Sequence, residues 1–381
     1  RPSLSGSIVL GGIVVAYLAM LVVSLVFDDV ARYVFWGAMA LASYGYVGYP
    51  LVLTCLAAFR KRGGEAPTEP SLADAVVSID PTVSLIIPAY NEHEIIRDKI
   101  KNSLSLDYPA DKLEIVVASD GSTDGTDNIL REYDGQGITA HYFSPRSGKM
   151  GALNKTLSRV ASEIVVFSDA NTMYRPDAIQ KLVRNFRDAT VGAVSGQVIL
   201  RNTHVSFGKS ENLYYRYERY LQKKETAFGS MLGADGAMYA IRRKLFSPPP
   251  SDTILDDFVI AMDVVRAGYR IVYEPEAIGD EETSPNLKSE FNRKSRIVAG
   301  AVQMMKRGYG IPASGQKSLW FQFLSHKFLR WVMPLVLIAL FAANLRLATT
   351  EIRAFVSILS GAIASAEPAP IHRGATASRA Y

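Results

Sequence analysis

Oxygen-bearing side chains follow directly after an apolar run in residues 165–171, VVFSDAN. Two valines and a phenylalanine are typical of a buried strand, and Asp169 and Asn171 stand two positions apart just beyond it. Packing does not require a carboxylate and an amide at that place. The spacing therefore points to a bound group held by oxygen ligands at a strand end.

Two other strand-like runs, residues 82–90 and 112–120, end at Asn91-Glu92 and at Asp120. Helical patterns alternate with these runs, which favours a doubly wound parallel sheet with helices on both faces. Ligands of such sheets bind beyond the carboxyl ends of the strands. A helix-capping role would explain any one of these acids, but three acids at three strand ends favour a ligand site.

The remaining elements are predicted from the same periodicities. Helices are expected at residues 92–105, 122–133, 151–161, 175–188, 209–227, 256–268 and 285–308. Further strands are expected at 138–144, 162–169, 191–200 and 269–275, and a strand with a turn within 231–246. The helix at 209–227 carries four tyrosines, at 214, 215, 217 and 220, for which core or membrane-edge packing is favoured over sugar stacking.

Charge-free stretches flank this region. Residues 7–27 and 33–59 are each long enough to cross a bilayer, which takes about 20 apolar residues. The basic cluster at 60–62 predicts that the chain from there onward is cytoplasmic. Residues 317–331 have the composition of an interfacial amphipathic helix, and residues 331–345 and 354–366 are short, marginal spans.

These patterns predict six parts. They are two transmembrane helices (1–62), a linker (63–81), a catalytic domain (82–310), an interfacial helix (311–330), one or more C-terminal transmembrane segments (331–366) and a tail (367–381). The single cysteine, Cys55, excludes a disulfide framework. The net charge of +5, with its basic residues near the membrane segments, does not indicate nucleic-acid binding.

Six stretches resemble the motifs of the family 2 glycosyltransferases: IIPAYNE (86–92), ASDGSTDGT (118–126), RSGKMGALN (146–154), FSDANT (167–172), GADGAMYAIRR (233–243) and ILDDF (254–258). In particular, they resemble those of the membrane-integrated synthases related to cellulose, chitin, hyaluronan and poly-N-acetylglucosamine synthases. The resemblance covers roughly residues 82–310. It implies a GT-A fold, which is a Rossmann-like mixed α/β sheet, a nucleotide-diphosphate sugar as donor and an inverting transfer.

The resemblance assigns the donor site and the metal site. The donor-binding residues that it implies are Ala89, Tyr90, Glu92, Asp120, Lys149, Asp169, Arg293 and Arg296. Asp169 and Asn171 correspond to the D-x-D element, which would hold the ribose and a Mg²⁺ or Mn²⁺ ion. Asn171 stands where the family has a second Asp, so the cation site has one charge less, or a carboxylate from elsewhere completes it.

The resemblance also assigns the catalytic base. Leu255-Asp256-Asp257 stands where the family has Thr-Glu-Asp, so Asp257 is expected to take the acceptor's proton and Asp256 stands in for the Glu. The alternative is a pair of acids that cap the following helix.

The acceptor side departs further from the family. Arg293 and Ile297 replace the Gln and Trp of a Q-x-x-R-W element, of which Arg296 remains. Gly233, Asp235 and Trp320 are the expected acceptor-binding residues. The missing Trp puts processive synthesis in question.

The sequence therefore predicts an inverting transferase in a bacterial-type inner membrane, with a cytoplasmic catalytic domain and a UDP-linked sugar as the expected donor. Its expected product is a growing exopolysaccharide that passes through the membrane part. Two alternatives stay open, a transferase that adds one sugar to a lipid-linked acceptor and a non-catalytic scaffold that binds nucleotide sugar. The expected partners are the donor, a carbohydrate or lipid-linked acceptor and the bilayer.

Overall fold

The computed structural model describes residues 16–63, 80–201, 206–282 and 287–365. They belong to two compact units. Of the described residues, those between 45 and 331 form the first unit, and residues 16–44 and 332–365 form the second. Most of the predicted linker, the predicted tail and the first half of the predicted first span lie outside the described residues.

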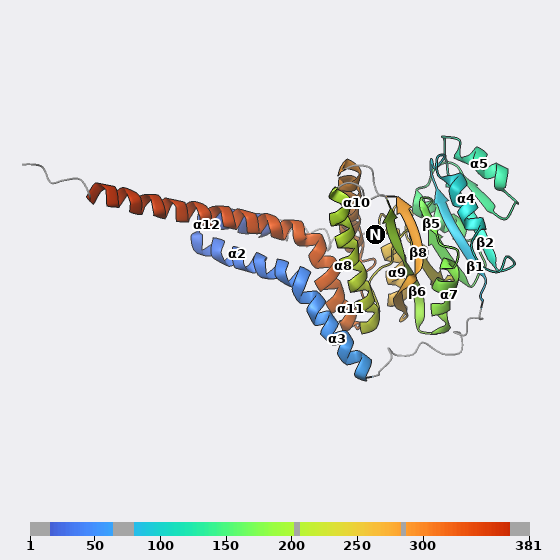
Figure 1. Ribbon diagram of the computed structural model, residues 1–381, viewed down its shortest axis with the longest axis horizontal. Coiled ribbons are helices and arrows are strands. Elements are labelled where there is room, and N and C mark those ends of the chain that lie inside the picture. Colours follow the sequence, from blue (N-terminus) through green and yellow to red (C-terminus); the bar gives the residue numbers. More distant parts are fainter. Residues whose placement is uncertain (1–15, 64–79, 202–205, 283–286, 366–381) are drawn as a thin grey trace, which may run out of the picture. The chain divides into compact units, whose positions relative to one another are not determined.

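An eight-stranded sheet forms the centre of the first unit (Figure 1). Its strands are β1 (Val83–Ala89), β2 (Leu113–Asp120), β3 (Thr139–Phe143), β4 (Ile164–Ser168), β5 (Thr172–Tyr174), β6 (Val191–Arg201), β7 (Met238–Arg242) and β8 (Arg270–Glu282). Their spatial order is β3-β2-β1-β4-β7-β6-β8-β5. β1 to β4 are parallel, whereas β7 runs antiparallel to β4 and β6, and β5 runs antiparallel to β8. The prediction of an all-parallel sheet is therefore wrong beyond β4, and the mixed sheet implied by the resemblance is confirmed.

Helices cover both faces because the central strands are apolar on both sides. On one face, α4 (Ile96–Leu104), α5 (Thr126–Tyr133) and α7 (Ala178–Val183) pack against side chains such as Leu85. On the other, α6 (Lys149–Leu157) and α9 (Asp256–Arg266) pack against side chains such as Ile86. Both helices of this second face begin at the sheet edge that carries the predicted site.

Strand β8 runs seven residues beyond the end expected at residue 275. Proline cannot donate a hydrogen bond to a strand ladder, and the strand nevertheless continues past Pro275. In the structure the β6–β8 register shifts between Ser195 and Gln197, and this irregularity accommodates Pro275. The extension then pairs with β6 on one side and with β5 on the other. This pairing brings the acidic end of β8 beside the loop that follows β4.

The remaining helices flank the sheet or lie in the second unit. They are α2 (Asp28–Ser43), α3 (Tyr49–Gly63), α8 (Ser206–Phe228), α10 (Leu287–Arg307), α11 (Lys317–Gln322) and α12 (Leu329–Ser365), with π-helical turns at Tyr44–Gly48 and Phe323–Phe328. Two stretches are long and apolar enough to cross a membrane by length and composition, Asp28–Phe59 and Lys317–Ile358, and Ala16–Val26 is a shorter apolar helix.

The apolar stretches at residues 331–345 and 354–365 lie on one continuous helix, α12, of 37 residues. No glycine or proline interrupts residues 346–353, which separate the two apolar stretches. Within the second unit, the guanidinium of Arg346 pairs with the carboxylate of Asp28 at 2.8 Å, which compensates its charge.

Candidate active site

The carboxyl ends of β1, β2 and β4 meet at one edge of the sheet, because these strands are parallel neighbours. The structure therefore places Glu92, Asp120 and Asp169 at this edge. The loop after β1 is joined to the loop after β2 through Asn91, which adopts a positive φ of 56°. Its side-chain oxygen accepts a hydrogen bond from the backbone N–H of Thr123 at 2.8 Å. Burial, together with the charges of Asp169 and Asp124, raises the pKa of Glu92.

Asp120 organises the loop before α6. Its buried carboxylate accepts hydrogen bonds from the backbone N–H groups of Ser147 at 2.8 Å and Gly148 at 2.6 Å. Arg146 lies 3.9 Å from the same carboxylate, and its guanidinium carbon sits 3.5 Å from the centroid of the Tyr90 ring. Both oxygens of Asp120 are thus bound by the loop, which sets the start of α6 and the position of Lys149.

Lys149 joins the end of β4 to the start of α9. Its Nζ lies 2.8 Å from Oδ1 of Asp169 and 3.5 Å from Oδ2 of Asp256. Burial alone would lower the pKa of Lys149, but the two carboxylates outweigh it and raise the pKa. Lys149 is therefore a fixed positive charge between Asp169, in the expected D-x-D element, and Asp256, in the expected catalytic motif.

Asp257, in the first turn of α9, is held close to the backbone of the GADGA segment. A Cβ at Gly236 would lie 2.8 Å from Oδ2 of Asp257, so only glycine allows this approach. Burial and the neighbouring charge of Asp256 raise the pKa of Asp257 to about 7, although Lys149 opposes the shift. A carboxylate with this pKa is suited to take a proton near neutral pH. Burial also raises the pKa of nearby Asp235.

Glu281 joins the site from β8, although the sequence analysis did not select it. The Nδ2 of Asn171 donates a hydrogen bond to Oε1 of Glu281 at 3.1 Å. Burial and the charges of Asp235 and Asp169 raise the pKa of Glu281 to about 7. The acidic run 280–282 did hint at it, but the expected strand ended before this run.

Lys99 is a second residue that the sequence analysis missed. It is fully buried on α4, and its Nζ donates to Oγ of Ser168 at 2.7 Å and to the backbone oxygen of Thr172. Burial lowers the pKa of Lys99 to about 7, against the opposing charge of Asp169. Lys99 therefore holds both ends of the loop that carries Asp169 and Asn171. In the sequence, the only indication of this role was that a lysine lies on the apolar face of the helix predicted at 92–105.

A small pocket without room for a water molecule lies between these groups, and its lining includes Lys149, Asp169, Gly236, Tyr239 and Asp256. The Tyr239 ring stacks on Phe167 with centroids 4.5 Å apart. Its hydroxyl is buried and has no hydrogen-bond partner. An unpaired buried hydroxyl in a polar pocket is unfavourable unless a ligand pairs with it.

The other predicted residues are less closely assembled. Ala89 ends β1, and Gly233 has a φ of 74° beside the ring of Phe258. Arg293 on α10 acts electrostatically on Asp235 and Glu281, whereas Arg296 is exposed. Trp320 packs on Phe323, and its indole N–H donates to the backbone oxygen of Ala313 at 3.1 Å. The structure therefore assigns Trp320 a packing contact and does not bring it to the acids.

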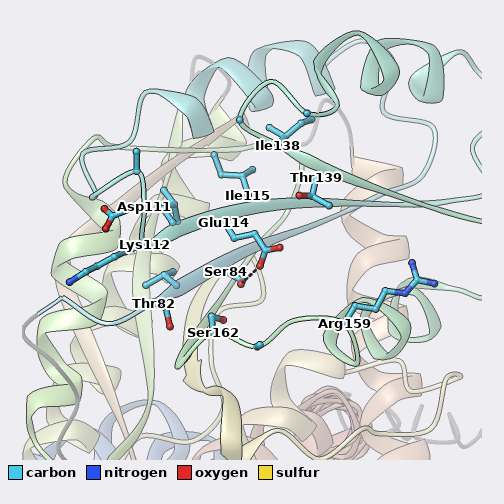
Figure 2. A pocket seen from close by; sticks show the side chains of 16 residues that line it. Thr82, Ser84, Asp111, Lys112, Glu114, Ile115, Ile138, Thr139, Arg159 and Ser162 are labelled. Carbon is cyan, nitrogen blue, oxygen red and sulfur yellow. Dashed lines mark hydrogen bonds between the residues drawn. The ribbon is translucent and has the colours of Figure 1, made fainter.

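A second, larger pocket of about 710 Å³ lies at the opposite, amino-terminal ends of β1, β2 and β3 (Figure 2). Ser84 and Glu114 are joined there by a hydrogen bond of 2.7 Å. None of the predicted site residues lines this pocket.

The side chains that could act as metal ligands at this site fit a hard cation. Asp169, Asn171 and Glu281 offer only oxygen ligands, the set that Mg²⁺ and Mn²⁺ prefer. Among the described residues, no three acidic, histidine or cysteine side chains stand close enough to hold a metal by themselves. A bound cation would therefore need amide oxygens or ligand oxygens as well.

Comparison with known proteins agrees with this geometry. Residues 81–300 match the profile of the family described as "Glycosyltransferase like family 2". The poly-beta-1,6-N-acetyl-D-glucosamine synthases of Staphylococcus aureus and Staphylococcus epidermidis are 25% and 27% identical to the chain, over 60% of it and 56% of their own length. The chain thus spans about half the length of the curated relatives it matches.

A solved structure covers more of the chain. It is a mannosyltransferase from Pyrobaculum calidifontis in complex with GDP-Man and Mn²⁺. The two proteins are 25% identical, with a TM-score of 0.64, over 88% of this chain and 93% of the other.

Proposed function

The chain belongs to the family 2 glycosyltransferases, and from this premise we propose that it is a membrane-integrated, inverting enzyme that extends an exopolysaccharide from a UDP-linked sugar. It is a hexosyltransferase that uses a nucleotide sugar and is homologous to polysaccharide synthases. The donor nucleotide, the acceptor and the membrane location are the proposed parts.

One observation carries the proposed mechanism. Lys149 contacts Asp169 of the donor motif and Asp256 of the catalytic motif, and the pKa of adjacent Asp257 is about 7. The site thus combines a positive charge for a leaving group with a base near it. These are the two demands of displacing a nucleoside diphosphate from an anomeric carbon.

In the proposed reaction, the acceptor hydroxyl oxygen attacks the anomeric carbon from the face opposite the diphosphate. Its proton passes to the carboxylate of Asp257, the new glycosidic bond forms, and the bond to the diphosphate oxygen breaks with inversion. Lys149 balances part of the charge on the departing diphosphate. Asp120 and Lys99 position the two loops that would hold the donor, through the hydrogen bonds described above.

A divalent cation is part of the proposal, with Asp169 and Asn171 as its expected ligands. When bound, it would neutralise diphosphate charge and so ease departure of the leaving group. The Mn²⁺ in the similar mannosyltransferase supports this assignment.

The membrane location is supported by Asp28–Phe59 and Lys317–Ile358, which are apolar and long enough to span. The basic cluster at 60–62 supports a cytoplasmic catalytic unit. Nucleotide sugars would then reach the site from the cytoplasm.

A second candidate is a single-addition transferase that uses GDP-mannose and a lipid-linked acceptor. The mannosyltransferase covers 88% of this chain, whereas the synthases cover 60%. Ile297 in place of an aromatic residue also removes a surface on which a growing polymer would stack.

The test is incubation of the full chain in lipid nanodiscs with UDP-GlcNAc, UDP-glucose or GDP-mannose, followed by mass spectrometry of the products. Polymer from a UDP-sugar supports the first candidate. A single mannose on a lipid supports the second. Absence of transfer from every donor, with lipid extracts supplied as acceptors, would contradict both.

A further inference from the structure

The loop after β4 has an amide where the family has its second acid, and a carboxylate from another strand lies against that amide. Asn171 donates a hydrogen bond to Glu281 across 110 positions of sequence. The contact is set by the sheet, because Thr172 on β5 is the antiparallel partner of Glu281 on β8. Asn171, immediately before this pair, is thus held beside the Glu281 side chain.

Glu281 differs from both of its acidic neighbours. Asp280 is neutralised by Arg201 at 2.8 Å and by Arg175 at 3.6 Å. Glu282 is exposed. Side chains alternate along a strand, so Glu281 faces away from both. Its carboxylate is half-buried, and among the described residues it forms no ion pair within 4.0 Å.

The hydrogen bond uses only part of the ligand capacity of this pair. The amide nitrogen of Asn171 points to one carboxylate oxygen. The second oxygen of Glu281 and the amide oxygen of Asn171 form no hydrogen bond in the described part of the chain. An amide that donates to a carboxylate also fixes the carboxylate's orientation. A single acidic group is therefore held beside the loop that lacks one.

We propose that Glu281 is the carboxylate ligand that replaces the missing acid at position 171, oriented by the Asn171 amide for a divalent cation shared with Asp169. This inference rests on the proposed function, because it assumes that the enzyme uses such a cation. It relocates one charge of the D-x-D element from the loop to the neighbouring strand, so the charge count of the site is conserved.

The test measures binding of Mn²⁺ alone to the full chain in nanodiscs of neutral lipid, from the electron paramagnetic resonance signal of the free ion. Glu281→Gln keeps the shape and can still accept the hydrogen bond from Asn171, but it loses the charge. We expect its Mn²⁺ dissociation constant to rise about tenfold to 100-fold. Glu282→Gln, one position along the same strand and exposed, is the matched control and should bind as the wild type does.

A charge swap tests the relocation itself. Asn171→Asp combined with Glu281→Gln returns the acid to the loop and should restore Mn²⁺ affinity to within about threefold of wild type, since the charge count is restored. If Glu281→Gln alone fails to fold, as judged by thermal melting, the swap variant decides by the same criterion.

The outcomes separate the two levels of the argument. Wild-type Mn²⁺ binding that Glu281→Gln leaves unchanged, or that the swap does not restore, overturns the role of Glu281 and leaves the proposed function standing. A wild type that binds no Mn²⁺ overturns the metal site as well. Binding of UDP and GDP in the presence of excess Mg²⁺ is measured separately, and its absence would contradict the proposed function itself.

Discussion

Buried acids at two places in the first unit have pKa values shifted in opposite directions. At the sheet edge, burial and like charges raise the pKa of Asp257 and that of Glu281 to about 7. Between α8 and the π-helical turn Phe323–Phe328, Glu225 is fully buried, yet its pKa is lowered. Burial would raise it, but His326, whose Nδ1 lies 2.6 Å away, the charge of Lys327 and the hydroxyl of Tyr49 at 2.7 Å together outweigh that effect.

The difference teaches that burial of an acid does not by itself mark a reactive site. Glu225 is compensated by partners from α3 and from the π-helical turn, so it stabilises the packing of these helices. The acids at the sheet edge outnumber the cations around them, so their charge is completed only when a ligand or a proton arrives.

The tyrosines of α8 lie on the same helix as Glu225, and like Glu225 they have partners within the protein. The hydroxyl of Tyr217 donates to the backbone oxygens of Gly45 and Tyr46, and Tyr214 lies under the guanidinium of Arg330. These contacts agree with the packing role that the sequence favoured for them over a sugar platform.

The largest expected effect is on Asp257. Asp257→Asn removes the proton acceptor and should reduce kcat by about 10²- to 10⁴-fold while donor binding is kept. The same change should stabilise the fold. The folded pKa of about 7 lies above the ordinary 3.8, so ionisation of Asp257 costs stability increasingly as pH rises between these values.

Melting temperatures at pH 5 and pH 8 measure this gain, which should be greater at pH 8. A variant that keeps transfer within a few-fold of wild type would exclude Asp257 as the base.

The compensated acid should behave in the opposite manner. Glu225→Ala leaves His326 and Tyr49 without their buried partner and should destabilise the first unit by about 3–5 kcal/mol. Thermal unfolding in nanodiscs measures this, with exposed Lys223→Ala on the same helix as the control. Equal melting temperatures for the two variants would mean that the Glu225 cluster does not stabilise the helix packing.

A smaller effect is expected on the pH profile of transfer. The rate should rise as pH increases through about 7, because Asp257 must lose its proton to act. Lys149 lowers this pKa and Asp256 raises it. Lys149→Met should therefore move the midpoint upward, and Asp256→Asn should move it downward.

Saturating donor separates these pH shifts from losses in binding. Lys155→Met, on the same helix α6, is the matched control and should leave the midpoint in place. Midpoints that do not move in opposite directions would contradict the electrostatic coupling of these residues.

The smallest expected effect concerns the unpaired hydroxyl in the pocket. Tyr239→Phe keeps the stack on Phe167 and removes one hydrogen bond to a bound substrate, so kcat/KM should fall about twofold to tenfold. The melting temperature of the ligand-free protein should not fall, because no protein partner is lost. Unchanged kinetics would show that the hydroxyl does not contact the substrate.

The sequence alone determined the elements that depend on local periodicity and the residues that follow them. The runs at 82–90, 112–120 and 162–169 became β1, β2 and β4, and their terminal acids lie at one edge. Asp169, Asp257 and Lys149 were selected from their motifs, and in the structure Lys149 contacts Asp169 and Asp256. The alternation of apolar residues and the signals that start helices depend only on neighbouring positions. They can therefore be recognised without knowledge of the fold.

Only the tertiary structure decided which distant segments complete the site. The antiparallel insertion of β7 beside β4, and the passage of β8 beyond Pro275, depend on pairing between strands far apart in sequence. These pairings bring Tyr239 and Glu281 to the donor motif, and the buried position of Lys99 follows from the packing of α4 on the sheet. No local pattern records such proximity, because a side chain's electrostatic surroundings are set by the fold and not by its neighbours in the chain.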